Sequence, residues 1–445
     1  MVKRATASAA AALVALSALA GPCLAFQPQP LWSTGRRSLP PSPSASAVRR
    51  RPRPSPAPLL AEVVTVGDAL FDCIAETDTA GWELDRVLKE ERWTAWPGGA
   101  PANVATALRK LGTASGFAGC IGADADGDEL AALFESIGVD TSLLQRSDDA
   151  PTRRVVVTRD AGMVPTFACF VNKRPANEFA DCLFDLTPEA LSPVELDAGL
   201  KGCRWVCSST LSLAFPKSQR SVRHLVDAAV EQGARKFVDI NWRDVFWPEG
   251  MEDFARDEIL DFARDADVIK LTDDEAEWLF QIEAAVAFGD PKRVHEKFPN
   301  AKAVLITSGE NGVSYSMLGQ VGTVPAFEVD VVETTGAGDA FTAGFLHGVL
   351  AMDIDFDMFE TLVPKNQRPL LIQLLITFAV AVAGLTCMGE GAIAPQPGYE
   401  EVESFMVEYE ATRRVDDEDD QSAASEALEG PPKTGLDEWK PKLGG

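Results

Sequence analysis

The residues best suited to chemistry form a short turn that ends in a carboxylate. Residues 333–341 read Glu-Thr-Thr-Gly-Ala-Gly-Asp-Ala-Phe, after a strand-like run over residues 327–332 and before a helical period. The small residues of the turn are Gly336, Ala337 and Gly338. Their consecutive backbone N–H groups can face one point at the positive end of the helix, which suits a phosphate. Asp339 in that position can accept the proton of an attacking hydroxyl, although it could also be only a favourable first-turn carboxylate.

A second glycine-rich segment has the composition of a polyol site. Residues 97–105 read Pro-Gly-Gly-Ala-Pro-Ala-Asn-Val-Ala. Gly98 and Gly99 allow a close backbone approach to a polyol, and Asn103 can exchange donor and acceptor bonds with its hydroxyls. The alternative is a plain glycine turn that caps the following helix, and the presence of both motifs together favours the binding site.

The other reactive side chains exclude several chemistries. The chain has only three histidines, which are too scattered for a zinc site or a Ser/His/Asp triad. The cysteines that follow Cys23 include no CxxC pair, so we interpret them as buried free thiols in a reducing compartment.

Charge is distributed unevenly along the 445 residues, whose net charge is -26. Eight basic residues precede the first acidic residue, Glu62, and the remaining 33 basic and 67 acidic residues give the rest of the chain a net charge of -34. Such an acidic body argues against nucleic acid or an anionic membrane surface as the main partner, because phosphate backbones require a basic stripe.

The elements that must position the two motifs alternate in type. From Glu62 onward, short β-rich runs alternate with helical periods, which indicates βαβ units and a mostly parallel sheet covered by helices. The expected strands are 62–67, 115–121, 205–209, 236–241, 267–271 and 303–307, and the expected helices are 102–111, 126–137, 218–232, 273–280 and 290–297. Residues 401–445 are expected to form a helix followed by an acidic, disordered tail.

Two segments depart from this alternation. The β-rich runs 153–158 and 166–171 flank Asp160-Ala161-Gly162, and we interpret them as an inserted hairpin and a candidate lid. Residues 369–389 carry no charge and are long enough to span a membrane. Polar interruptions such as Gln373 and Thr377 favour a buried core helix instead.

The leader is typical of a targeting sequence. Lys3 and Arg4 precede an apolar run that ends in a small-residue cleavage site, which predicts a signal peptide over residues 1–25. Residues 26–60 are rich in Ser, Pro and Arg and contain no acid, so they are similar to a plastid transit peptide. Together they resemble the bipartite presequence of algae with secondary plastids and predict a stromal location. The alternative is a secreted protein with a disordered basic arm.

Thr335-Gly336-Ala337-Gly338-Asp339 resembles the C-terminal signature of the ribokinase/PfkB family of sugar kinases, and residues 97–105 resemble its N-terminal signature, with wording closest to the fructokinases. The resemblance covers about residues 62–397. It implies a ribokinase-like three-layer α/β/α domain over residues 61–400, with a small β-sheet lid built from elements around 72–97 and 150–180. It also implies that Asp72 is a sugar-binding carboxylate.

The resemblance further implies sites for ATP and Mg²⁺. The nucleotide-binding residues would be Thr307, Gly309, Gly312, Thr335, Gly391, Ala392, Asn241 and Arg243. Glu275 and Thr272 would contact Mg²⁺ through water, although Thr272 stands where the family motif has Asn. Glu333 replaces the usual Asp at a possible monovalent-cation site for K⁺. Lys173 and Arg174 follow the fructokinase lid pattern only loosely as substrate-binding cations.

These residues predict an ATP-dependent kinase, with Asp339 as the base, that converts fructose to fructose 6-phosphate. Its partners would be the sugar and ATP, it would not bind nucleic acid directly or, in its mature form, a membrane, and it could form a homodimer. One alternative is a family kinase for another acceptor, namely ribose, a nucleoside or a ketodeoxy sugar acid. The other is a non-catalytic fructokinase-like plastid scaffold.

Overall fold

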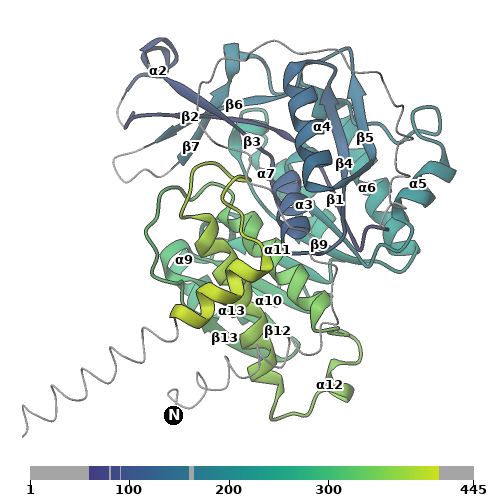
Figure 1. The fold of residues 1–445 in the computed structure, drawn as a ribbon, viewed down its shortest axis with the longest axis vertical. Helices are drawn as coiled ribbons and strands as arrows, with labels where there is room; N and C mark the ends of the chain where they lie inside the picture. The colour runs from purple at the N-terminus through teal and green to yellow at the C-terminus, as the bar shows by residue number, and fades with distance from the viewer. Residues whose placement is uncertain (1–59, 80–81, 91, 160–164, 410–445) are drawn as a thin grey trace, which may run out of the picture.

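The structure is a computed structural model that describes residues 60–79, 82–90, 92–159 and 165–409 (Figure 1). The predicted signal and transit segments up to residue 59, the hairpin tip at residues 160–162 and the tail from residue 410 lie outside the described residues.

The main sheet has nine strands in the order β13-β12-β11-β10-β9-β8-β1-β4-β5. These strands are β1 Val63–Val66, β4 Ser115–Gly122, β5 Asp140–Ser147, β8 Trp205–Ser209, β9 Arg235–Asp239, β10 Val268–Thr272, β11 Ala303–Thr307, β12 Val313–Met317 and β13 Gln320–Val324. The strands from β11 to β5 run parallel, whereas β12 and β13 form an antiparallel edge. Every residue of β1 is buried, which is typical of a parallel strand covered on both faces.

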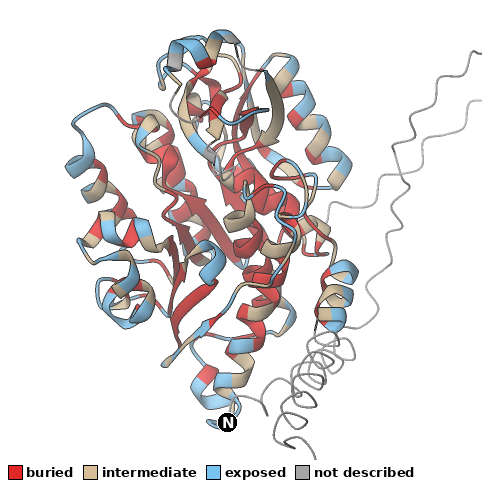
Figure 2. Cartoon of the chain, turned by 90° about the vertical axis from the view of Figure 1, so that its left-hand side faces the viewer, coloured by how far each residue is buried: buried red, intermediate tan, exposed pale blue. Residues whose placement is uncertain are grey.

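Helices cover both faces of the main sheet, which confirms the three-layer prediction. One face, which includes Val63, packs against α3 Ala100–Lys110, α11 Ala337–Ala351 and α13 Arg368–Thr386. The other, which includes Val64, packs against α6 Pro216–Glu231, α7 Glu252–Ala263 and α8 Asp273–Phe280. Successive strand residues point to opposite faces, so Val63 and Val64 belong to different cores. Figure 2 shows the buried residues gathered along the sheet and its covering helices.

The remaining elements are short or peripheral. The helix α4 Ala125–Ile137 packs on β4 through Leu130 and Phe134, and its N-cap is Asp124. The other helices are α2 Leu84–Glu90, α5 Pro193–Leu200, α9 Ala284–Gly289, α10 Pro291–His295 and α12 Phe359–Leu362. Five 3₁₀ turns are described: η2 Val171–Lys173, η3 Ala180–Leu183, η4 Leu211–Ala214, η5 Asp244–Phe246 and η6 Gly309–Asn311.

A second sheet, called the small sheet from here on, has the strand order β3-β2-β6-β7. Its strands are β2 Leu70–Ala75, β3 Trp93–Gly98, β6 Arg154–Arg159 and β7 Pro165–Phe170. The predicted hairpin is confirmed as the antiparallel pair β6–β7, and β6 lies parallel to β2. Because β2 follows β1 after only three residues, the small sheet stands at the carboxyl ends of the main-sheet strands (Figure 1).

The apolar run at residues 369–389 forms α13, the core helix that we expected. By length and composition α13 could cross a membrane, yet 56% of its most apolar window is buried inside the fold, much of it against α11. Its residues Ile372, Leu375 and Ile376 have no exposed surface.

The predicted strand at residues 327–332 is wrong. This segment forms no ladder, because the sheet already ends at β13. Instead Phe327 packs against Phe405 and Tyr409 of a helical segment over residues 399–409. This contact accounts for Phe327, whereas Val331 and Val332 of the same run are exposed.

Candidate active site

The site forms where the carboxyl ends of the parallel strands meet. The order of the sheet reverses between β1 and β8, and ligands of open α/β sheets bind in the crevice at such a switch point. Asp68 follows β1, Ser209 ends β8 and Asp239 ends β9. All three side chains are buried.

Gly98 and Gly99 of the second glycine-rich segment lie against the Asp72 carboxylate and the Asp68 backbone. A Cβ on Gly98 would lie 2.4 Å from Asp72 Oδ2, and one on Gly99 would lie 2.5 Å from the Asp68 carbonyl oxygen. Gly99 also has φ +100°, a conformation that favours glycine. Only glycine therefore lets β3 and the start of α3 approach Asp68 and Asp72 this closely.

Asn103 joins the two motifs. It lies in the first turn of α3, and its Nδ2 donates to Asp339 Oδ2 at 2.8 Å. Asp339 lies in the first turn of α11, where backbone N–H groups have no intrahelical partner. The structure thus brings the predicted base and the predicted sugar-binding amide into direct contact.

Burial and mutual repulsion shift the carboxyl groups of this site toward neutrality. Burial, followed by repulsion from Asp239, raises the pKa of Asp339 to about 7. Burial also raises the pKa of Asp72 to about 7, and Asp68, Asp339 and Glu333 raise it further. Burial is likewise the main reason that the pKa of Asp68 rises to about 6. Two carboxyl groups with a pKa near neutrality suit proton transfer at physiological pH.

The site contains buried polar atoms that have no partner among the described residues. They are Asp68 Oδ1 and Oδ2, Asp72 Oδ1, Asn103 Oδ1 and Ser209 Oγ. Such atoms are rare in folded proteins, since leaving one unpaired costs about 1–3 kcal/mol. The carboxylates, when ionised, and the Asn103 amide oxygen accept hydrogen bonds only, so a partner that supplies several hydroxyl or N–H donors fits them. A polyol meets this requirement.

Neighbouring residues pack closely against the predicted phosphate turn. Gly336 is the N-cap of α11 with φ +78°, and a Cβ there would lie 2.7 Å from Ala392 Cβ. A Cβ on Gly338 would lie 3.0 Å from Lys270 Nζ. The turn therefore places the amino end of a helix and an ammonium group side by side, which suits a phosphate.

Lys270 is a site residue that the sequence motifs did not indicate. It is buried in β10, and its Nζ pairs with Asp239 Oδ1 at 3.0 Å and Oδ2 at 2.8 Å. Burial acts to lower its pKa, but Asp239, Glu275 and Asp339 together raise it. A charged Lys270 therefore lies among three carboxylates beside the phosphate turn.

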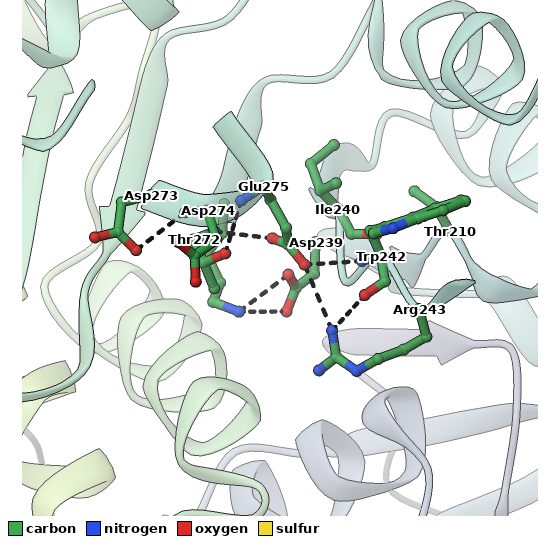
Figure 3. Close-up of polar contacts among 10 residues, drawn as sticks. Thr210, Asp239, Ile240, Trp242, Arg243, Thr272, Asp273, Asp274 and Glu275 are labelled. Carbon is green, nitrogen blue, oxygen red and sulfur yellow. Dashed lines mark hydrogen bonds and ion pairs between the residues drawn. The ribbon is translucent and has the colours of Figure 1, made fainter. Parts of the chain in front are cut away.

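Glu275, the predicted metal residue, is held by backbone groups. Its Oε1 accepts from Trp242 N and its Oε2 from Thr272 N, both at 2.8 Å, while the Thr272 hydroxyl accepts from Glu275 N as the N-cap of α8. Arg243 Nη1 lies 3.6 Å from Glu275 Oε1 (Figure 3).

This arrangement fits Mg²⁺ only if water molecules bridge the metal ion and the carboxylates. No group of three His, Cys, Asp or Glu side chains that could hold a metal occurs in the part of the chain that the structure describes. Mg²⁺ usually keeps several waters and binds to substrate phosphates plus one or two carboxylates. Glu275, in the first turn of α8, is a carboxylate of that kind, whereas both oxygens of Asp239 already accept from Lys270 Nζ.

The predicted nucleotide loop lies beside the same strand ends. Thr307 pairs with Thr272 across β11 and β10. The loop then forms η6, with Gly309 at φ +45° and Gly312 at φ +88°. Asn241, after β9, also has a positive φ of 44°. Thr307 and Asn241 thus lie at the carboxyl ends of β11 and β9, the edge of the sheet that also carries Arg243.

Glu333 is enclosed rather than open. It is 2% exposed, its Oε1 accepts from Thr335 Oγ1 at 2.7 Å, and its Oε2 accepts from Gly391 N at 3.0 Å. Arg159, the last residue of β6, reaches the same Oε2 at 2.9 Å. In the structure, Glu333 ties the phosphate turn to the small sheet and to the Gly391 loop.

Lys173 and Arg174 lie away from these groups. Lys173 pairs with Asp85 of α2, and Arg174 lies 3.6 Å from Glu178. Both cations are exposed. The described arginines that approach the site are instead Arg159 and Arg243.

Comparison with known proteins gives consistent results. The family model described as "pfkB family carbohydrate kinase" matches residues 60–398. Fructokinase-1 of Zea mays is 32% identical over 340 residues, which cover 76% of this chain and 96% of the maize protein. The ATP-bound structure of fructokinase from Xylella fastidiosa has a TM-score of 0.63 and 28% identity, over 78% of this chain and 99% of that one. A double-mutant fructokinase from Vibrio cholerae O395 with fructose, ADP and potassium shares the fold, with a TM-score of 0.60, 22% identity and coverage of 79% and 100%.

Proposed function

The chain belongs to the pfkB family of carbohydrate kinases and is a sugar kinase that uses ATP, and from that premise we propose that it phosphorylates fructose to fructose 6-phosphate. The observation that carries the choice of a polyol is the set of unpaired acceptors on Asp68, Asp72 and Asn103. Sequence relatives that are named fructokinases support fructose as the member of that class.

In the proposed reaction, the sugar lies between the small sheet and the amino ends of α3 and α11. Asp72 and the side-chain Oδ1 of Asn103 accept hydrogen bonds from its hydroxyls and orient the ring. Asp339 accepts the proton of the reacting primary hydroxyl, and the bond from Asn103 Nδ2 holds that carboxylate in place.

The transferring phosphoryl group meets the amino end of α11. The backbone N–H groups of Gly338 and Asp339 and the ammonium group of Lys270 stabilise the charge on its oxygens. Glu275 would hold ATP-bound Mg²⁺ through water, and the metal would supply charge neutralisation. The small sheet excludes water, which limits wasteful hydrolysis of ATP.

An ATP-coupled assay of the chain from Ala61 tests the proposal. The panel contains fructose, ribose, adenosine and a 2-keto-3-deoxy sugar acid, with ADP release as the readout. Fructose should have the highest kcat/KM. A higher value for another acceptor would replace the substrate, and no turnover with any acceptor would favour the scaffold alternative. Light scattering of the same sample tests the predicted homodimer.

We also propose that the leader directs the protein to the plastid stroma. The support is the apolar run over residues 9–20 followed by a long stretch without acid, up to residue 61. A fluorescent fusion of residues 1–61 expressed in an alga with secondary plastids should accumulate in the stroma. Fluorescence in the medium would support secretion instead.

A further inference from the structure

Arg159 occupies the place beside Glu333 where a cation would be needed. Glu333 lies in the phosphate turn and is almost fully buried, and a buried carboxylate requires a positive partner. The guanidinium of Arg159 provides it at 2.9 Å, with only 12% of its side chain exposed. The charge of Glu333 is therefore neutralised by the protein itself.

The N–H and guanidinium donors at Glu333 Oε2 stand where a metal ion bound to that oxygen would lie. Oε1 accepts from Thr335, and Oε2 accepts from Gly391 N and pairs with Arg159. An ion at Oε2 would face an N–H group and a guanidinium, both of which repel a cation. The groups that converge on this carboxylate are hydrogen-bond donors, which bind anions rather than cations. The residues present therefore do not fit the predicted K⁺.

Backbone bonds to Thr79, in the loop after β2, hold Arg159 in position. Thr79 N donates to the Arg159 carbonyl at 2.9 Å, and Arg159 N donates to Thr79 Oγ1 at 3.3 Å. The small sheet touches the same loop a second time, because the Trp96 ring lies 2.9 Å from where a Cβ on Gly391 would be. The guanidinium thus links a restrained strand end to the phosphate turn.

We propose that Arg159 is a positioning residue that replaces a monovalent cation, so that phosphoryl transfer in this protein does not depend on K⁺. The proposal rests on the proposed kinase function. Glu333 and Arg159 form a matched pair: the carboxylate holds the phosphate turn through Thr335 and the Gly391 loop, and the guanidinium carries the charge.

The test compares cations at constant ionic strength. Initial rates of the full chain in tetramethylammonium, Na⁺ and K⁺ should agree within about twofold. In Arg159→Ala, which leaves space beside Glu333, kcat in tetramethylammonium should fall about tenfold or more, and K⁺ should restore a large part of it. Arg159→Lys should keep the insensitivity to cations.

Arg154→Ala is the matched control. Arg154 begins the same strand but pairs with Asp126 at 2.6 Å, away from the phosphate turn. Its loss should produce no dependence on K⁺. If it did, weakening of the small sheet rather than the charge beside Glu333 would be the cause, and the proposal would be wrong.

Melting temperatures provide a readout that needs no catalysis. K⁺ should raise the Tm of Arg159→Ala relative to tetramethylammonium and leave the wild-type Tm unchanged. A wild-type response to K⁺ in rate or Tm overturns the proposal, as does an Arg159→Ala protein that responds in neither. If no sugar is phosphorylated in any cation, the proposed function fails, while the melting temperatures still decide whether Arg159 takes the place of the cation.

Discussion

Replacing Asp339 with Asn should abolish most turnover and yet make the protein more stable above neutral pH. The variant keeps the shape of the side chain and an oxygen that can accept from Asn103 Nδ2. It removes the base, so kcat should fall about 10²- to 10⁴-fold. It also removes a negative charge that burial and Asp239 make costly.

The size of the stability gain follows from the pKa of Asp339. A rise from 3.8 to about 7 corresponds to about 4 kcal/mol once the group is ionised. Asp339 is only half-buried, so this figure is an upper bound, and solvent screening reduces the expected gain to about 2 kcal/mol. For a domain of this size that gain corresponds to a rise in Tm of about 3 °C.

The pH dependence of Tm distinguishes removal of the Asp339 charge from a stabilisation that is independent of charge. Because the folded-state pKa is raised, the folded protein binds more protons than the unfolded chain between about pH 4 and pH 7, and wild-type stability falls as pH rises through that window. Asn mimics the protonated form, so the difference in Tm should be small near pH 4 and reach its maximum above pH 7.

Calorimetry from pH 4 to pH 8 and the coupled assay measure the two effects. Asp128→Asn is the control, since it removes one carboxylate whose side chain is 75% exposed, in the first turn of α4. It should change neither kcat nor the pH dependence of Tm. An Asp339→Asn enzyme with a near-normal rate would refute the base assignment. A Tm difference that is independent of pH would refute the electrostatic argument.

Three further outcomes follow from the same site. The kcat/KM for the sugar should rise about tenfold per pH unit below pH ~7 and level off above it, because the Asp339 carboxyl must lose its proton. A flat profile of initial rates from pH 5 to pH 9 would contradict this. Gly98→Ala should raise the KM for the sugar about tenfold or more without changing that for ATP, since its Cβ would lie 2.4 Å from Asp72 Oδ2, whereas Gly289→Ala, which meets nothing within 4 Å, should be neutral. Lys270→Met should lower the free energy of unfolding in urea by about 3–5 kcal/mol, because it leaves Asp239 buried without its partner. Adding Asp239→Asn should recover most of that stability but not the catalytic rate. A Lys270→Met protein as stable as the wild type would show that the ion pair is not needed for stability.

The sequence predicted the elements and motifs that depend on local pattern. Buried strands such as β8 and β11 show as short apolar runs, and the glycine turns mark the helix starts that carry Asn103 and Asp339. The contact between Asn103 and Asp339 follows from two helix starts, each marked by glycine. These features required no knowledge of side-chain packing.

The missed residues depend on register and packing. Lys270 lies in Val-Ile-Lys-Leu-Thr, and its role arises because it stands opposite Asp239 in the ladder of β10 and β9. Arg159 meets Glu333 only because β6 ends beside the phosphate turn. Lys173 follows a left-handed Asn172 and has a positive φ itself, so the chain turns and directs this cation to Asp85. Spacing along the sequence contains none of these three-dimensional relations.

The bond between Asn103 and Asp339 joins residues that are 236 positions apart. During synthesis, the segment that carries Asp68 and Asp72 emerges long before the helix that carries Asp339, and pairings over such separations form late in folding. Burial and Asp68 are the largest causes of the raised pKa of Asp72, but two further charges that raise it, on Asp339 and Glu333, arrive with the late segment. Part of the electrostatic strain at Asp72 is therefore added only when the helix that carries Asp339 docks.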